Sequence, residues 1–162
     1  MSYSRIAIAL LAALSLAGCR TEPAANVSQP LAARTAPSGL DLVPLSIVSG
    51  GRTHRFTVEV ARTSDEQAQG LMFRERLGRD EGMLFPFPSP RPASFWMRNT
   101  LIPLDMIFIR NDGTIARIAA NAVPRSEEPV SSGEPVIAVL EIKGGRSAEL
   151  SLREGDRVSW PR

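Results

Sequence analysis

Few residues of this chain belong to the types that carry out catalysis. It contains one histidine, His54, and one cysteine, Cys19. A serine hydrolase needs a nucleophile, a base and a residue that orients the base, and a zinc site needs clustered His and Cys ligands. No phosphate-binding glycine loop and no regularly spaced calcium loop occurs either. The sequence therefore predicts no metal and no nucleotide cofactor, and it favours His54 as an ordinary residue at a strand start.

Paired carboxylates are the remaining enzymatic possibility, because glycosidases and transglycosylases need only two acids held across a cleft. The acids considered are Glu75, Asp80, Glu81, Asp105 and Glu141. Asp80 and Glu81 lie in a polar loop, and Glu141 flanks the end of an apolar strand, so solvated or structural roles are favoured for them. The prediction leans away from an enzyme and keeps a carboxylate-dependent envelope hydrolase or transferase as an alternative.

Asp105 is the most informative of these acids, because it opens an apolar strand and shares a face with Ile107 and Ile109. A buried carboxylate without a partner costs free energy or shifts its pKa upward. We therefore expect a buried ion pair or hydrogen bonds from the backbone, with Arg74 and Arg98 as the expected partners. The pair is either structural or part of a polar cluster that faces a ligand.

Trp96, Arg98, Asn99 and Thr100 lie in and beside a turn that precedes this strand. Trp96 is either a core residue or the wall of a groove. In the second case, an apolar wall with converging polar groups is typical of a site that recognises a polar ligand or a peptide. With Arg74 and Asp105, these residues form the candidate ligand-binding or buried polar cluster.

Short strands make up most of the elements expected to position these residues. Residues 54–61 alternate apolar and polar side chains, and the glycine turn at 50–51 joins them to the apolar run 42–48 as a hairpin. Thr63 and Glu66 have the spacing of a capping box, which predicts a short helix.

Three further strand predictions depend on apolar runs. The run 82–85 is expected to end at the prolines that follow, because proline donates no ladder hydrogen bond. The two-sided apolar runs 105–110 and 136–142 are expected in the centre of a sheet, and residues 111–113, Asn-Asp-Gly, predict a hairpin to residues 114–123. A loop is expected over residues 123–135. Six to eight strands with one short helix and no β–α–β alternation predict a mainly β domain, a sandwich or a barrel.

The N-terminal region has the features of an export signal. Arg5 precedes the apolar run 6–18, which is too short to span a bilayer. Residues 16–19, Leu-Ala-Gly-Cys, resemble the lipobox of bacterial lipoproteins, in which the cysteine carries the lipid. Residues 1–18 are therefore the expected signal peptide, and residues 19–40, rich in Ala, Pro, Ser and Thr, are the expected lipidated, flexible tether.

Lipidation of Cys19 predicts a protein anchored to a membrane and facing the periplasm. Several acyl chains give stable anchoring where one chain is marginal. Arg20 in place of aspartate implies, by analogy with bacterial lipoproteins, the outer membrane of a Gram-negative host. With Cys19 used as the anchor, the folded domain, residues 41–162, contains no thiol for a disulfide or a nucleophile.

The amino-acid composition limits the remaining classes of protein to which this chain could belong. Apolar residues make up 43% of the 162 and charged residues 22%, which is typical of a globular domain, and residues 41–162 suffice for one core. The formal net charge is +2, and no basic run could follow a phosphate backbone. Nucleic acid is therefore not an expected partner.

Three segments together resemble the domain of unknown function 192 family: residues 56–77, residues 82–87 and, above all, residues 94–109 with the hairpin after them. The resemblance covers residues 56–158. It implies a single β-sandwich domain of jelly-roll-like topology with a small helix, often exported in bacteria, and no established activity. Arg98 stands where the family often has lysine, and the planar guanidinium is not equivalent to an ammonium group.

These observations predict a tethered, non-catalytic β-domain that binds an envelope ligand or a partner protein through the candidate cluster. An envelope enzyme that uses carboxylates is one alternative. A structural component of an envelope complex is the other, and it would present an exposed apolar patch.

Overall fold

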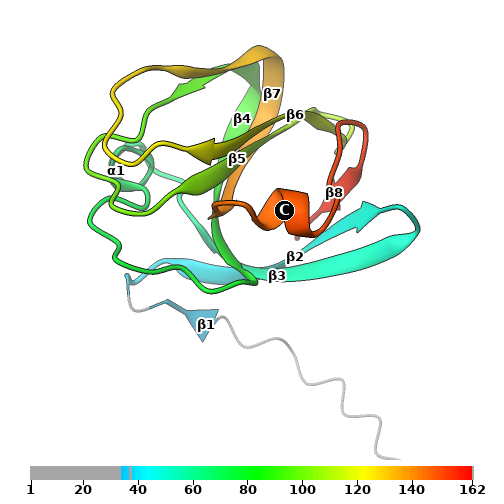
Figure 1. Cartoon of the computed structure of the whole chain (residues 1–162), viewed down its shortest axis with the longest axis horizontal. Helices are drawn as coiled ribbons and strands as arrows, with labels where there is room; N and C mark the ends of the chain where they lie inside the picture. Colours follow the sequence, from blue (N-terminus) through cyan, green and yellow to red (C-terminus); the bar gives the residue numbers. More distant parts are fainter. Residues whose placement is uncertain (1–33, 37, 162) are drawn as a thin grey trace, which may run out of the picture. The chain divides into compact units, whose positions relative to one another are not determined.

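The computed structural model describes residues 34–36 and 38–161 (Figure 1). The expected leader, Cys19 and the tether up to residue 33 lie outside these residues. The described part contains eight strands and two short helices: β1 (Arg34–Thr35), β2 (Asp41–Ser49), β3 (Arg52–Val60), α1 (Ser64–Gln69), β4 (Glu81–Phe95), β5 (Leu104–Ile109), β6 (Ile115–Ala122), β7 (Val130–Lys143), α2 (Arg146–Glu149) and β8 (Arg157–Ser159). The mainly β class is confirmed, with α2 as a second helix beyond the one expected.

The strands of the described part belong to one curled sheet. Its order is β1-β2-β3-β4-β7-β5-β6, and β8 pairs with β2. The neighbouring strands run antiparallel except β3 and β4, which are parallel and are connected through α1. This crossover is a β–α–β unit that the sequence did not indicate. In Figure 1 the β2–β3 hairpin lies below β4, β5 and β7 and meets these strands where β3 pairs with the start of β4, and α2 and β8 lie above the hairpin in this view.

Local turn chemistry produced the two predicted hairpins. Gly50 and Gly51, at φ 54° and 75°, connect Ser49 to its register partner Arg52. Gly113, at φ 84°, closes the turn between β5 and β6, where its amide donates to the carbonyl of Arg110. Glycine reaches these left-handed conformations at little steric cost, so both hairpins form where the glycines lie.

The capping box at α1 is also confirmed. The Thr63 hydroxyl accepts a hydrogen bond from the Glu66 amide, and the Glu66 carboxylate accepts one from the Thr63 amide. The helix is short, and Gly70 ends it. Its importance lies in its place, because α1 forms one side of the pocket described below.

Two apolar clusters cover the two faces of β4, β5 and β7. One face packs against β2, β3 and β8 through residues such as Ile47, Phe56 and Val158. The opposite face carries a second cluster, with members Met83, Phe85, Leu104, Met106, Phe108, Val139, Leu71 and Met97. The prediction that residues 105–110 and 136–142 are central strands is confirmed: every residue of β5 is buried, and β7 lies between β4 and β5.

The proline-rich segment did not end a strand, and that prediction was wrong. β4 continues to Phe95, with its register to β7 shifted between Pro86 and Arg91. Among the described strands, β3 pairs with β4 only as far as Leu84. The Pro86 carbonyl accepts from Gln67 on α1, so the backbone of Pro86 faces away from β7. The next two prolines lie in the bulge between Pro86 and Arg91, where a missing N–H group interrupts no ladder bond.

The loop expected over residues 123–135 is shorter than predicted, because β7 begins at Val130. Val130 pairs with Phe95 and Ser131 with Ser94 on the continued half of β4. The unexpected length of β4 thus provides the partner that extends β7.

All described residues belong to the compact unit Leu31–Arg162. Both apolar clusters and every strand pair described above lie inside it, so this unit contains the contacts that a domain needs to fold by itself. β1 and residues 36 and 38–40, at the end of the expected tether, are part of it: β1 pairs with β2, and the Ser38 hydroxyl donates to Glu59. Among the described residues, no helix is long and apolar enough to cross a membrane.

Candidate functional site

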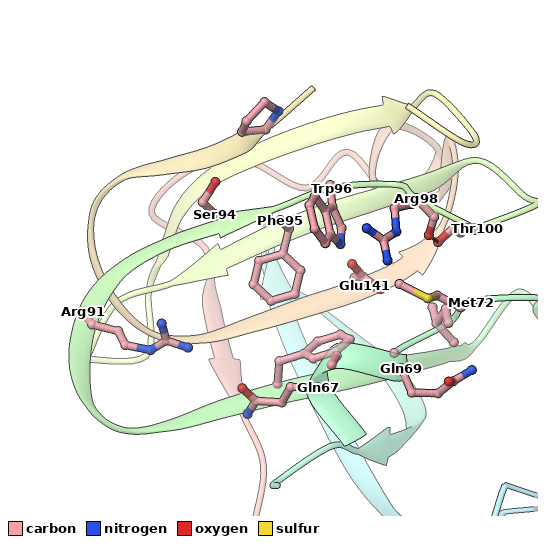
Figure 2. Close-up of a pocket in the computed structure, with 15 residues that line it drawn as sticks. Gln67, Gln69, Met72, Arg91, Ser94, Phe95, Trp96, Arg98, Thr100 and Glu141 are labelled. Carbon is pink, nitrogen blue, oxygen red and sulfur yellow. Dashed lines mark hydrogen bonds between the residues drawn. The ribbon is translucent and has the colours of Figure 1, made fainter. Parts of the chain in front are cut away.

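A pocket of about 580 Å³ opens between α1, the end of β4, the turn that follows β4, and β7. This volume lies within the range of small-molecule sites. Figure 2 shows its polar side chains: Gln67 and Gln69 come from α1, Arg91 and Ser94 from β4, Arg98 and Thr100 from the turn, and Glu141 from β7. The pocket lies on the sheet face of the Phe85 and Met106 cluster.

Glu141 lies at the floor of the pocket with 4% of its surface exposed. It pairs in register with Met83 on β4 and with Met106 on β5, so a thioether side chain flanks it on each side. Among the described residues, none donates a hydrogen bond to its carboxyl group. Burial in these apolar surroundings raises the pKa of Glu141 to about 8, because the charged form loses its hydration. At neutral pH most molecules therefore carry a neutral carboxylic acid at this position.

Aromatic side chains form the walls. The rings of Phe85 and Phe95 meet edge to face, with centroids 5.1 Å apart and planes at 81°. Trp96 is half-exposed, at 49%, although it is one of the largest apolar side chains of the domain. Since burying such a ring is favourable, an exposed Trp beside a pocket is typical of a ligand-binding wall.

Two guanidinium groups line the same pocket. The Arg98 Cζ lies 4.9 Å from the centre of the Trp96 ring, and the Arg91 Cζ lies 3.9 Å from the centre of the Phe87 ring. Both distances fit cation–π contacts. Within the described part of the chain, neither arginine forms an ion pair. In Figure 2 the Arg98 guanidinium extends from the turn toward the interior of the pocket, on the same side as Glu141.

Strained backbone flanks several of the residues that line the pocket. Phe73, Asn99 and Arg125 all have positive φ, at 61°, 57° and 62°, although none is glycine. Their loops are tied together, because the Phe73 amide donates to the Asn99 carbonyl and the Arg125 amide to the Thr100 carbonyl. Such strain persists only where the surrounding structure enforces it, and it concentrates at functional sites.

The pocket gathers part of the predicted cluster. Trp96, Arg98 and Thr100 line it. Asn99 does not line it, but its side-chain amide contacts the sulfur of the lining residue Met72 at 3.8 Å. Of the four turn residues singled out from the sequence, three therefore line the cavity and one contacts a residue that lines it.

Asp105 lies apart from the pocket, sealed in the core with no exposed surface. Its carboxylate accepts hydrogen bonds from the amides of Asn121, Gly145 and Ser147 at 2.8, 2.9 and 2.7 Å, and a further one from the Ser147 hydroxyl. These donors anchor the start of β5 to the end of β6 and to α2. Asp105 is thus satisfied by backbone donors and a hydroxyl. The prediction that Arg74 or Arg98 pairs with it was wrong.

Arg74 forms its ion pair with Glu59 instead, at 2.7 Å. It lines a different cavity, which Glu75, Asp80 and Glu81 share. Asp80 pairs there with Arg146 at 2.7 Å, and Glu81 accepts the Gly78 amide. These acids are exposed, and Asp80 and Glu81 already have hydrogen-bond partners within the domain.

Glu141 is the residue that sequence reasoning considered and set aside. It does not flank a strand end, since it lies inside β7 with buried residues on both sides. The available signal was an acid within an apolar run, the same signal that drew attention to Asp105. Among the described residues, no group of three or more His, Cys, Asp and Glu side chains could hold a metal ion.

Comparisons with known proteins agree with this architecture. The profile of the family DUF192, described as "Uncharacterized ACR", matches residues 45–160. No curated protein matches the chain.

Two solved structures are similar. A protein of unknown function from Novosphingobium aromaticivorans DSM 12444 is 49% identical, with a TM-score of 0.77 over 86% of this chain and 99% of that one. A protein provisionally named as a transcription regulator, from Sinorhizobium meliloti 1021, is 44% identical, with a TM-score of 0.73 over 75% of this chain and 95% of that one.

Proposed function

This chain belongs to the uncharacterised DUF192 family, and from that premise we propose that it is a lipid-anchored envelope protein whose β-domain binds a small molecule in the pocket above Glu141. One observation carries the binding proposal: Glu141, with 4% of its residue surface exposed, lies at the floor of an open cavity, and no described residue donates a hydrogen bond to its carboxyl group. Buried polar groups in folded proteins are almost always paired. A ligand that pairs with Glu141 would remove this exception.

The walls support the same reading. Phe95 and Trp96 offer flat apolar surface, and Arg98 adds hydrogen-bond donors beside them. A mainly apolar cavity with a few converging polar groups is the usual form of a small-molecule site. The positive φ of Phe73 and Asn99, which neighbour the lining residues Met72 and Arg98, fixes the backbone beside the pocket.

The envelope location is supported by the sequence alone. The apolar run 6–18 ends in a lipobox-like Leu-Ala-Gly-Cys segment, and Cys19 is the single cysteine of the chain. Residues 20–33 then separate the anchor from β1. The domain would sample the periplasm close to a membrane surface, where small envelope compounds are accessible.

The carboxylate-dependent enzyme receives no support from this pocket. Glycoside hydrolysis needs two acids about 5–9 Å apart. Within the described part of the chain, Glu141 is the only acid that lines the pocket.

A partner-binding role has one observation in its favour. Phe73 and Val123, both on loops, expose 61% and 67% of their surface. In cells, crosslinking through these two positions would capture a partner protein if the loops dock one.

The binding proposal can be tested with the compact unit of residues 31–162 and the neutral fluorophore phenylnaphthylamine, which brightens in apolar sites. We expect saturable binding of one molecule per domain. Ala68→Trp places an indole at the α1 side of the pocket and should abolish binding. Ala120→Trp, on an exposed position of β6 that does not line the pocket, is the matched control and should bind normally. The proposal is lost if the fluorophore does not bind, or if Ala68→Trp binds it as well as the control.

A further inference from the structure

Two of the side chains that line the pocket can only donate hydrogen bonds. Arg98 and Arg91 present guanidinium N–H groups, which have no acceptor. The Thr100 hydroxyl makes one long contact of 3.5 Å, to the Arg98 carbonyl. The Gln67 amide nitrogen already donates to the carbonyls of Ala61 and Pro86, so Gln67 offers a ligand its oxygen. A ligand that carries strong acceptors suits the two guanidinium groups.

The charge of the pocket is positive near neutral pH. Arg91 and Arg98 contribute two positive charges, and Glu141 is the one acid among the described lining residues. The neighbouring strands place only Met83 and Met106 beside Glu141, so no charged group from β4 or β5 pairs with it in register. Because its pKa is raised to about 8, roughly one Glu141 in ten is ionised at pH 7. The protonated acid then acts as one more donor.

The apolar part of the pocket is shaped for a flat body. Phe85 and Phe95 meet edge to face, and Trp96 lies half-exposed beside them. Rings prefer such edge-to-face and offset contacts, so an aromatic ligand finds favourable geometry here. The cation–π contact keeps the Arg98 guanidinium next to the Trp96 ring, at the edge of this apolar surface. A bound ring would therefore have a cation within reach of its acidic end.

We infer that the pocket takes an organic anion with a flat apolar body and a terminal carboxylate, whose oxygens meet Arg98 and whose ring lies against Phe95 and Trp96. This inference rests on the proposed function and adds the chemical class of the ligand. A charge-assisted hydrogen bond between a guanidinium and a carboxylate is stronger than a neutral one. A cationic ligand would instead be repelled by the two guanidinium groups. It would also need Glu141 in its charged form as a counter-ion.

The experiment uses three probes of similar size that differ in charge: phenylpropionate, phenylpropanol and phenylpropylamine. Each is titrated against phenylnaphthylamine bound to residues 31–162 at pH 7, and the concentration that displaces half of the fluorophore is measured. We expect the anion to displace it at about tenfold lower concentration than the alcohol, since one charge-assisted hydrogen bond is of this size. The amine should be the weakest competitor. The inference is overturned if the amine competes best, or if the anion and the alcohol are equivalent.

The variant Arg98→Gln tests whether Arg98 causes the preference for the anion. It removes the guanidinium, so in this variant the anion and the alcohol should displace the fluorophore at the same concentration. Arg55→Gln, at an exposed position of β3 outside the pocket, is the control and should leave the preference intact. An Arg98→Gln variant that keeps the preference for the anion would contradict the inference. Since the fluorophore is neutral, its failure to bind would refute the pocket itself, whereas a wrong order of probes would refute only the ligand class.

Discussion

Glu141 lies directly opposite Met106 in the register of β7 and β5, so a carboxyl group and a thioether share the sheet face that forms the floor of the pocket. A buried acid in such surroundings favours its neutral form. The folded protein therefore holds a proton on Glu141 at pH values where the unfolded chain has released it. This difference links the stability of the domain to pH.

Replacing Glu141 with Gln should remove that link. Between about pH 4.5 and pH 8 the unfolded state is ionised at Glu141 and the folded state is protonated, so wild-type stability falls as pH rises and levels off above pH 8. The slope from this one group is at most about 1.4 kcal/mol per pH unit. Urea unfolding at pH 5, 7 and 9 should show the variant gaining stability relative to wild type as pH rises.

Glu127→Gln is the matched control for this experiment, because Glu127 is an exposed acid in the loop before β7. It should keep the wild-type dependence on pH. A Glu141→Gln variant that follows the wild-type curve would show that Glu141 is ionised in the folded protein at neutral pH.

Asp105→Asn should strongly destabilise the domain. The carboxylate satisfies three backbone amides and the Ser147 hydroxyl, and an Asn side chain has one oxygen and turns its own NH₂ group toward these donors. Leaving at least two buried donors without an acceptor costs about 3 kcal/mol or more. Asp112→Asn, at an exposed turn where the acid accepts from Thr114, should cost much less. Urea unfolding measures both.

The same variant distinguishes a structural role from a binding role. Under conditions where Asp105→Asn remains folded, phenylnaphthylamine should bind as it does to wild type. Lost binding in a folded variant of unchanged stability would place Asp105 in the ligand site.

Arg74→Met should destabilise the domain without altering the pocket. Its partner Glu59 has a side chain only 8% exposed, and after the change it would keep only the hydrogen bond from Ser38. Removing one partner of a largely buried pair leaves an uncompensated charge, which costs about 1–3 kcal/mol here because Arg74 itself is partly exposed.

Arg62→Met removes the corresponding exposed pair with Asp41, in which both side chains are more than half exposed. The free energy of unfolding should change by less than about 1 kcal/mol. If Arg74→Met and Arg62→Met lower the free energy of unfolding by the same amount, the burial of Glu59 has no energetic consequence.

Cys19→Ser tests the proposed anchor. The full-length protein expressed in a Gram-negative bacterium should incorporate labelled palmitate and sediment with the outer membrane, and the variant should do neither, because the serine hydroxyl cannot form the thioether. Arg20→Asp, which leaves the cysteine in place, should keep the label but redirect the protein to the inner membrane. Membrane sedimentation of the serine variant at the wild-type level would contradict the lipid anchor.

The sequence by itself determined the features that depend on neighbouring residues. The glycines at 50, 51 and 113 set the hairpins, since only the local backbone conformation matters there. Thr63 and Glu66 set the start of α1 through hydrogen bonds within one turn. The two-sided apolar runs of β5 and β7 already required burial on both faces, and the cluster from Trp96 to Thr100 already combined the groups that line a pocket.

Tertiary structure alone decided the roles of the two acids. Asp105 and Glu141 are each an acid in an apolar strand, yet the amides that satisfy Asp105 come from 16, 40 and 42 residues away along the chain, while the neighbours of Glu141 in register are Met83 and Met106. The prolines of β4 likewise became compatible with a strand through the bulge in its register with β7. Strand register and long-range hydrogen bonds depend on the whole fold, so the environment of a side chain is not encoded in its immediate neighbours. The fold therefore made Asp105 a structural anchor and, among the described residues, left Glu141 without a hydrogen-bond donor.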